Sequence, residues 1–145
     1  MIVLVGWQTY DNVKTKYNDK FIDETQYPVK ACDYILENID LSKARFYNEY
    51  NYGSYMIYRG IPVFIDSRAD LYAPEFSGLK DDIFTDFIDV SSIGTFYEDI
   101  LEKYNITHVI LYSNSKMSMI IDETKDPHYS KIYKDDYFVI YERVK

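Results

Sequence analysis

The sequence has almost no cysteine, which limits the ways in which the chain is held together. Cys32 is the only cysteine among 145 residues, so no disulfide forms within the chain. It falls on a helical face with Ile35, Leu36 and Ile39, and we interpret it as a buried apolar side chain, because free cysteine is commonly buried. The lack of disulfides leaves the cellular compartment undecided.

Long apolar runs are also missing at the start of the chain. Residues 1–5 are apolar and are followed by Gly6 and Trp7, which is far too short for a membrane span and lacks the basic region of a signal peptide. Two interpretations stay open. The segment is either a buried edge strand or the last turn of a transmembrane helix, with Trp7 and Tyr10 at the level of the lipid headgroups.

The sequence shows no internal linker, and 145 residues are enough to bury one hydrophobic core. Residues 8–25 are polar and aperiodic. We therefore expect residues 1–26 to be a connector that follows a transmembrane segment, and residues 27–145 to be a single soluble α/β domain.

Basic residues are few and dispersed. The 16 Lys and Arg residues are outnumbered by 24 Asp and Glu residues, which gives a formal net charge of -8. No basic stripe exists to neutralise a phosphate backbone, so we expect no nucleic-acid partner and no polybasic contact with anionic lipid. The 17 tyrosines suit half-wet, half-apolar surfaces that face a partner or a membrane.

Sequence motifs for metal, nucleotide and nucleophilic chemistry are absent. There is no G-x-G-x-x-G and no Walker A lysine, and neither His108 nor His128 has a second His or Cys at metal-ligand spacing. Ser67 lies in a charged turn without a nucleophile-elbow pattern. We expect no metal site and no cofactor, and we assign no catalytic residue.

Short apolar runs with polar ends predict a sheet that is buried on both faces. They cover residues 44–48, 62–66 and 107–112. Residues 49–61 leave room for little more than two helical turns, as in a minimal βαβ unit. The strand-like segments around Asp135-Asp136 predict a closing hairpin. We expect a three-layer α/β fold with a central, mostly parallel sheet and a C-terminal antiparallel β-hairpin.

Apolar residues at helical spacing predict the helices that flank this sheet. One helix opens at Pro28, which stands at the favoured first-turn position. Three more are expected over residues 79–90, 94–104 and 113–124.

Polar residues gather where the expected strands end. In open α/β sheets the ligand lies beyond the carboxyl ends of the strands, and Asn48, Asp66, Arg68 and Asp70 belong to that edge. The start of the short helix would add backbone N–H groups that suit an anion. The candidate ligand-binding residues are therefore Asn48, Tyr52, Gly53, Ser54, Asp66, Arg68 and Asp70.

Each of these candidates has a structural interpretation beside the functional one. We favour the structural one, in which Asn48 caps the short helix or bonds across the turn and Arg68 pairs with Asp66 or Asp70 and orders the loop. If the segment is extended, all three charged side chains lie on one side of it. Ser113 and Asn114, after the third strand, are open to the same two interpretations.

The order of several motifs resembles that of a known class of membrane protein. These are Tyr27-Pro28 before a helix, the Asn48–Tyr58 segment, PVFIDSR from Pro62 to Arg68 followed by DLY, KYNITHVILY from Lys103 to Tyr112, and the final KDDYFVIYER. The order is similar to that of the C-terminal extracytoplasmic domain of multi-spanning bacterial membrane proteins of the GT-C glycosyltransferase type. The common pattern has glycine where this chain has Ser67.

The resemblance implies a location and a role. The chain is expected to be a non-catalytic outer domain on the extracytoplasmic face of the cell membrane, packed against the transmembrane region of its own parent chain. It is expected to cover the active face or to help hold an acceptor glycan or peptide. Enzymes of that class keep their catalytic acidic residues near the amino-terminal membrane region. The alternative is a free-standing small-molecule enzyme or binding module that uses the crevice at the strand ends.

Overall fold

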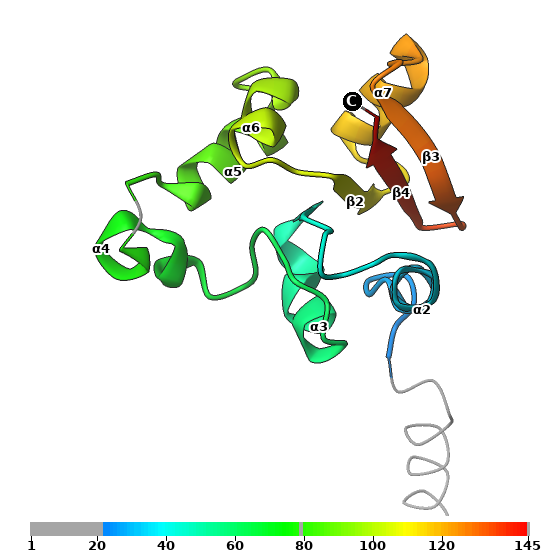
Figure 1. Cartoon of the computed structure of the whole chain (residues 1–145), viewed down its shortest axis with the longest axis horizontal. Coiled ribbons are helices and arrows are strands. Elements are labelled where there is room, and N and C mark those ends of the chain that lie inside the picture. The colour runs from blue at the N-terminus through cyan, green and yellow to red at the C-terminus, as the bar shows by residue number, and fades with distance from the viewer. Residues whose placement is uncertain (1–21, 79, 145) are drawn as a thin grey trace, which may run out of the picture.

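The computed structural model describes residues 22–78 and 80–144, which form a mixed α/β fold around one four-stranded sheet (Figure 1). The strands are β1 (Phe46–Asn48), β2 (His108–Tyr112), β3 (Tyr129–Lys134) and β4 (Phe138–Arg143), in the order β1-β2-β4-β3. The helices are α2 (Val29–Asn38), η1 (Tyr50–Tyr52), α3 (Gly53–Tyr58), η2 (Ala69–Tyr72), α4 (Pro74–Ser77), α5 (Ile83–Ser92), α6 (Tyr97–Lys103) and α7 (Lys116–Thr124). Most of the expected connector, and Leu79, lie outside the described residues.

The sheet is mixed rather than mostly parallel. β1 and β2 pair in parallel, with Phe46 opposite His108, which confirms that two of the three expected strands are neighbours. β4 pairs antiparallel with both β2 and β3. The β3–β4 hairpin around Asp135-Asp136 is as predicted. Within the described residues one pairing of the sheet is parallel, so the expectation of a mostly parallel centre was wrong.

The missing parallel strand is the segment over residues 62–66, which was expected to pair and does not. It runs beside β1 without strand structure. Pro62 has no N–H to donate to a ladder, and the next groups along the segment bond to a side chain instead. Asn48 accepts from the N–H of Phe64 and donates to the carbonyl of Ile65. One asparagine side chain therefore takes the place of a strand pairing.

Successive side chains of β1 and β2 belong alternately to two buried apolar clusters. Tyr47, Val109 and Leu111 belong to a cluster with residues of α5, α6 and α7. Phe46 and Ile110, one position away, belong to a second cluster with residues of α2 and α3. Successive side chains of a strand point to opposite faces, so β1 and β2 read as continuous apolar runs in the sequence.

Local residues and capping hydrogen bonds mark where several of the helices begin. Pro28 precedes α2, as expected from its fixed φ. Asp82 caps α5 by accepting from the N–H of Thr85, and Ser115 caps α7 in the same way through Ser118. Within the described residues, no helix is both long and apolar enough to cross a membrane.

Tyrosine hydroxyls donate hydrogen bonds to carboxylates at six places in the described part of the chain. Each pair satisfies a partly buried hydroxyl and a carboxylate with one bond. The pairs are Tyr72–Asp66, Tyr97–Asp126, Tyr104–Asp86, Tyr129–Glu98, Tyr133–Asp135 and Tyr141–Asp122.

Candidate functional site

The structure brings most of the expected site residues together, at the junction of β1, the η1–α3 helix and residues 64–67. Their polar atoms, however, face one another or the backbone. Asn48 and Asp66 are both 0% exposed. The cluster therefore joins three segments of the chain and leaves few groups free for a ligand.

Asn48 is fully used by the fold. Its Oδ1 accepts from Phe64 N at 2.8 Å and from Ile65 N at 3.4 Å. Its Nδ2 donates to the carbonyls of Ile65 and Glu49 at 2.8 and 3.0 Å. These four contacts saturate the amide, and the structural interpretation of Asn48 holds.

Tyr52 and Gly53 have equally structural positions. The Tyr52 hydroxyl donates to the carbonyl of Ile110 in β2 at 2.7 Å, while it accepts from Glu49 N. A Cβ on Gly53 would stand 2.1 Å from the carbonyl oxygen of Ile65, so only glycine permits this close approach. The Ser54 and Ser67 hydroxyls lie 2.8 Å apart and bond to each other.

The charged turn pairs Asp66 with Arg68, as predicted, and leaves Asp70 apart. Arg68 Nη2 donates to Asp66 Oδ2 at 2.5 Å and Nε donates to Oδ1 at 3.0 Å, while Tyr72 Oη donates to Oδ2 at 2.9 Å. Hydrogen bonds from Arg68 hold the pKa of Asp66 at about 2. The expected three-residue cluster required extended backbone. Because η2 begins at Ala69, Asp70 leaves that side and is exposed.

A shallow hollow of about 530 Å³ lies beside this turn, and Arg68 and Asp70 line it. The Arg68 side chain is 59% exposed there, yet its guanidinium already bonds to Asp66. Among the described residues, none that lines this hollow has a buried polar side-chain atom without a partner.

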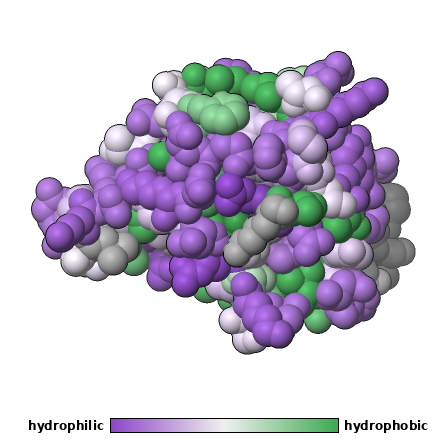
Figure 2. Space-filling view, turned by 45° about the horizontal axis from the view of Figure 1, so that its top comes forward, coloured by the Kyte–Doolittle hydropathy of each residue, from purple (hydrophilic) through white to green (hydrophobic). Residues whose placement is uncertain are grey.

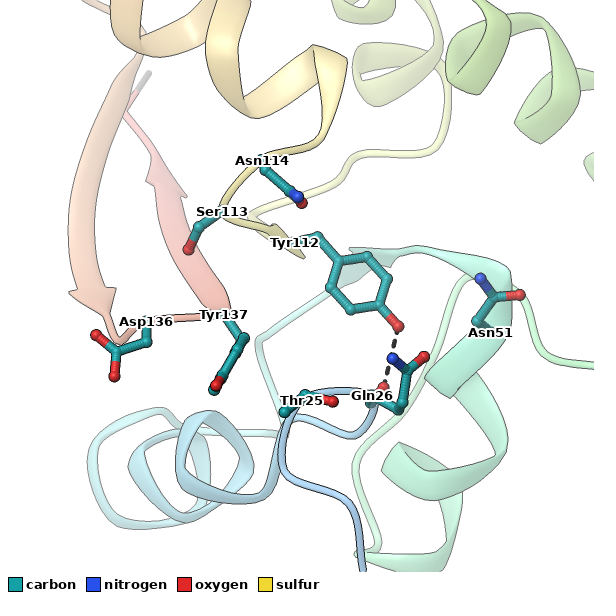
Figure 3. Close-up of a pocket in the computed structure, with 8 residues that line it drawn as sticks. All are labelled: Thr25, Gln26, Asn51, Tyr112, Ser113, Asn114, Asp136 and Tyr137. Atoms are coloured by element: carbon teal, nitrogen blue, oxygen red, sulfur yellow. Dashed lines mark hydrogen bonds between the residues drawn. The ribbon is translucent and has the colours of Figure 1, made fainter.

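A polar cleft of about 490 Å³ lies nearby, at the carboxyl end of β2 (Figure 3). It collects two tyrosine rings, three side-chain amides, two hydroxyl side chains and one carboxylate. The lining residues are Thr25, Gln26, Asn51, Tyr112, Ser113, Asn114, Asp136 and Tyr137.

Four segments hold the cleft in shape. The Tyr112 hydroxyl donates to the carbonyl of Gln26 at 3.0 Å, which ties the turn before α2 to the end of β2. Ser113 N donates to the carbonyl of Tyr137, which ties β2 to the hairpin turn. Asn51 comes from η1, directly after β1. Figure 3 shows Asn51 on one side of the Tyr112 ring, with Asp136 and Tyr137 on the other.

Ser113 has a polar atom that the fold leaves unused. Its Oγ is buried and makes no hydrogen bond within the part of the chain that the structure describes. Buried hydroxyls are normally bonded, so Ser113 Oγ is an exception among the polar atoms around the cleft.

Glu49 lies behind the cleft and carries the strongest perturbation of a carboxyl near it. Its Oε2 accepts from Tyr112 N at 3.1 Å, and its side chain caps η1. Burial raises the pKa of Glu49 to about 7, against the opposing effect of these hydrogen bonds. The side chain does not line the cleft but fixes Tyr112 in it.

Sequence reasoning found only part of this cleft. Ser113 and Asn114 were singled out because they follow a strand, and the structure places both in the lining. Gln26, Asn51 and Asp136 were missed. Asn51 follows the end of β1 by three residues, so the rule that ligands lie at strand ends could have found it. Gln26 reaches the cleft through its tertiary contact with Tyr112.

Acidic residues are numerous, but within the described ranges no group of three His, Cys, Asp or Glu side chains is arranged to hold a metal ion. No family model, curated protein or solved structure matches the chain. The function therefore has to be argued from the cleft and from the order of the motifs.

Proposed function

We propose that this chain is a non-catalytic outer domain of a membrane-embedded glycosyltransferase-like protein, and that the cleft at the carboxyl end of β2 helps to hold an acceptor glycan. The observation that carries the proposal is the lining of the cleft: tyrosine rings beside side-chain amides and hydroxyls, with a single carboxylate. The order of sequence motifs supports the membrane context.

The chemistry of the lining suits a neutral sugar. Hydroxyl and acetamido groups of a sugar both donate and accept hydrogen bonds, as do the amides of Gln26, Asn51 and Asn114. Tyrosine rings offer an apolar face together with a polar tip. The one charge in the lining is the carboxylate of Asp136, and the whole chain is acidic, which disfavours an anionic ligand.

A holding role is favoured over chemistry by the partners of the polar groups. A nucleophilic serine needs a base within hydrogen-bond reach, and the Ser113 hydroxyl has no such partner among the described residues. Asp66 is committed to Arg68 and Tyr72.

The proposal places the domain on the extracytoplasmic face of a bacterial cell membrane, against the transmembrane region of its own parent chain. Figure 2 shows a largely hydrophilic face with scattered apolar side chains, as suits a domain that meets both water and partners. The three-layer architecture belongs to this proposal. Successive residues of β1 and β2 belong alternately to the two buried clusters, which supports this architecture.

The test is a binding measurement on the 145-residue chain. We would titrate it with a panel of neutral and anionic oligosaccharides and follow heat and tyrosine fluorescence. We expect neutral members to bind, and Asn51→Ala and Asn114→Ala to weaken that binding about tenfold each, the effect of losing one hydrogen bond. Asn38→Ala removes an exposed amide from α2, away from the lining, and is the matched control.

Two results would overturn the proposal. One is the absence of binding to every oligosaccharide in the panel. The other is binding that the cleft variants leave unchanged. Tight binding of extended peptides in place of sugars, lost in the same variants, would assign the cleft to a peptide acceptor. Turnover of a small molecule in it would favour the free-standing enzyme.

A further inference from the structure

We propose that the cleft continues along a strip of three tyrosines, Tyr27, Tyr55 and Tyr58, and that cleft and strip together bind a linear neutral oligosaccharide. This inference rests on the proposed function. It adds to that function the length of the ligand and the direction in which it leaves the cleft. These three residues are called the tyrosine strip below.

The strip and the cleft share two segments of the chain. Gln26 and Asn51 both line the cleft, and each is followed along its own segment by a strip residue. Tyr27 is the next residue after Gln26. Tyr55 comes four residues after Asn51, which is about one helical turn along the continuous η1–α3 segment. The Tyr27 and Tyr55 rings meet with their centroids 5.6 Å apart.

Tyr58 extends the strip by one more ring. It lies three residues after Tyr55 on α3, and the two centroids are 6.2 Å apart. Tyr58 is 79% exposed and Tyr27 39% exposed, so the strip presents ring surface to the solvent. Single exposed aromatics need no explanation, but here three rings follow one another in tilted contacts, at interplanar angles of 52° and 37°.

The charge that touches the strip is already neutralised. Arg59 Nη1 donates to the Tyr55 hydroxyl at 3.1 Å, and Nη2 pairs with Asp33 Oδ1 at 2.6 Å. This pair fixes the Tyr55 ring and leaves the guanidinium engaged. The exposed rings of Tyr27 and Tyr58 therefore favour a ligand that packs its apolar faces on them and carries no charge of its own, as a neutral sugar chain does.

The experiment compares ligand lengths. We would measure the binding of chito-oligosaccharides and cello-oligosaccharides of two and of five units to the 145-residue chain, to Tyr58→Ala and to Phe76→Ala. Phe76 is 71% exposed on α4 and serves as the matched control for loss of an exposed aromatic ring. Wild type is expected to bind the longer chain about tenfold more tightly. Tyr58→Ala is expected to lose about three- to tenfold for the longer chain and nothing for the shorter one.

The outcomes separate this inference from the function on which it rests. Equal affinity for both lengths, with short-chain binding intact and no effect of Tyr58→Ala, overturns the strip and leaves the cleft standing. Failure of both lengths to bind overturns both proposals for these ligands. In a parallel arm with neutral phosphatidylcholine vesicles, a loss of vesicle binding in Tyr58→Ala without any effect on sugars would make the strip a membrane contact and overturn the inference.

Discussion

Asn48 joins the loop after α3 to the edge of the sheet. Its amide makes four hydrogen bonds to the backbone, and the residue is 0% exposed. Asn48→Ala should lower the free energy of unfolding by roughly 2–4 kcal/mol, because backbone groups of Phe64 and Ile65 lose their partner inside the protein. Urea denaturation followed by circular dichroism measures this change.

The matched control for Asn48 is Asn51, the same residue type three positions later. Asn51 is exposed on η1. Asn51→Ala should change the free energy of unfolding by less than about 0.5 kcal/mol. Equal urea midpoints for Asn48→Ala and wild type would contradict the linking role of Asn48.

Glu49 should make the stability depend on pH in the opposite direction from Asp66. Burial raises its pKa from 4.5 to about 7 in the folded protein. Between these values the folded state keeps a proton that the unfolded chain has released, so this group lowers stability as the pH rises. Glu49→Gln should remove that loss, which is on the order of 1–3 kcal/mol.

The measurement is the free energy of unfolding at several pH values between about 4 and 8. The difference between wild type and Glu49→Gln cancels the other titrating groups. Glu37→Gln, a change at an exposed position on α2, is the control for loss of one carboxylate. A wild-type-minus-variant difference that stays flat with pH would contradict the raised pKa of Glu49.

At the scale of elements, the β3–β4 hairpin depends on the first of its two turn aspartates. Asp135 Oδ1 accepts from the N–H of Tyr137 and of Phe138, and Oδ2 accepts from the Tyr133 hydroxyl. Asp135→Ala should lower the free energy of unfolding by roughly 1–2 kcal/mol, since three bonds that close the turn are lost.

Asp136 provides the matched control within the same turn, because it is exposed and lines the cleft. Asp136→Ala should leave the free energy of unfolding within about 0.5 kcal/mol of wild type. Thermal and urea unfolding of the two variants compares them directly. Similar losses in both would mean that net charge in the turn, not the bonds of Asp135, stabilises the hairpin.

The Asp66–Arg68 pair should set the acid stability of the turn that leads into η2. The pKa of Asp66 lies at about 2, below its ordinary 3.8, so its contribution is present above 3.8 and is lost as the pH falls through 2. Arg68→Ala should lower the urea midpoint at pH 7, because a carboxylate that is 0% exposed loses its cation.

The same variant should also reduce the loss of stability between about pH 4 and pH 2, because the folded-state pKa of Asp66 rises toward its ordinary value. Arg45→Ala, at an exposed position before β1, is the control for loss of one cation. An unchanged urea midpoint together with lost activity of the parent protein would favour a functional role for Arg68.

Local signals predicted those elements whose stabilising contacts are short-range. Pro28 before α2 and the Asp135-Asp136 turn lie within the elements that they define, and both predictions were confirmed. Residues 62–66 have the composition of a buried strand, yet their pairing depends on the distant Asn48 side chain. The composition of that segment indicated a buried element, but it could not indicate that the pairing partner is the Asn48 side chain.

The same distinction applies to the site. The rule for strand ends pointed to the edge of the sheet where the cleft lies, and Ser113 and Asn114 line that cleft. The charged candidates Asp66 and Arg68 turned out to bond to each other. Gln26 joins the lining from a turn more than eighty residues before its partner Tyr112, and this contact exists only in the folded chain.

For the molecule as a whole, the charged candidates Asp66 and Arg68 bond within the fold, while amides and hydroxyls line the cleft. This arrangement supports a holding role over a catalytic one. We predict that the 145-residue chain transfers no sugar by itself. The carboxylate of Asp66 is enclosed by Arg68 and Tyr72, and no donor-binding motif accompanies it. A fold supplies chemistry only through a site, and the resembled enzymes keep theirs in the membrane region.

The measurement is incubation of the purified chain with labelled nucleotide sugars and polyprenyl-phosphate sugars, with and without divalent metal ions, followed by assays for transfer and hydrolysis. Neither product is expected above the level of boiled protein. Metal-dependent turnover that Asp66→Asn abolishes, and that Asp70→Asn at the exposed neighbouring carboxylate retains, would contradict the prediction. It would make the Asp66 crevice an active site. Sugar binding without turnover, sensitive to Asn51→Ala and Asn114→Ala, agrees with a domain that presents an acceptor to chemistry performed elsewhere in its parent protein.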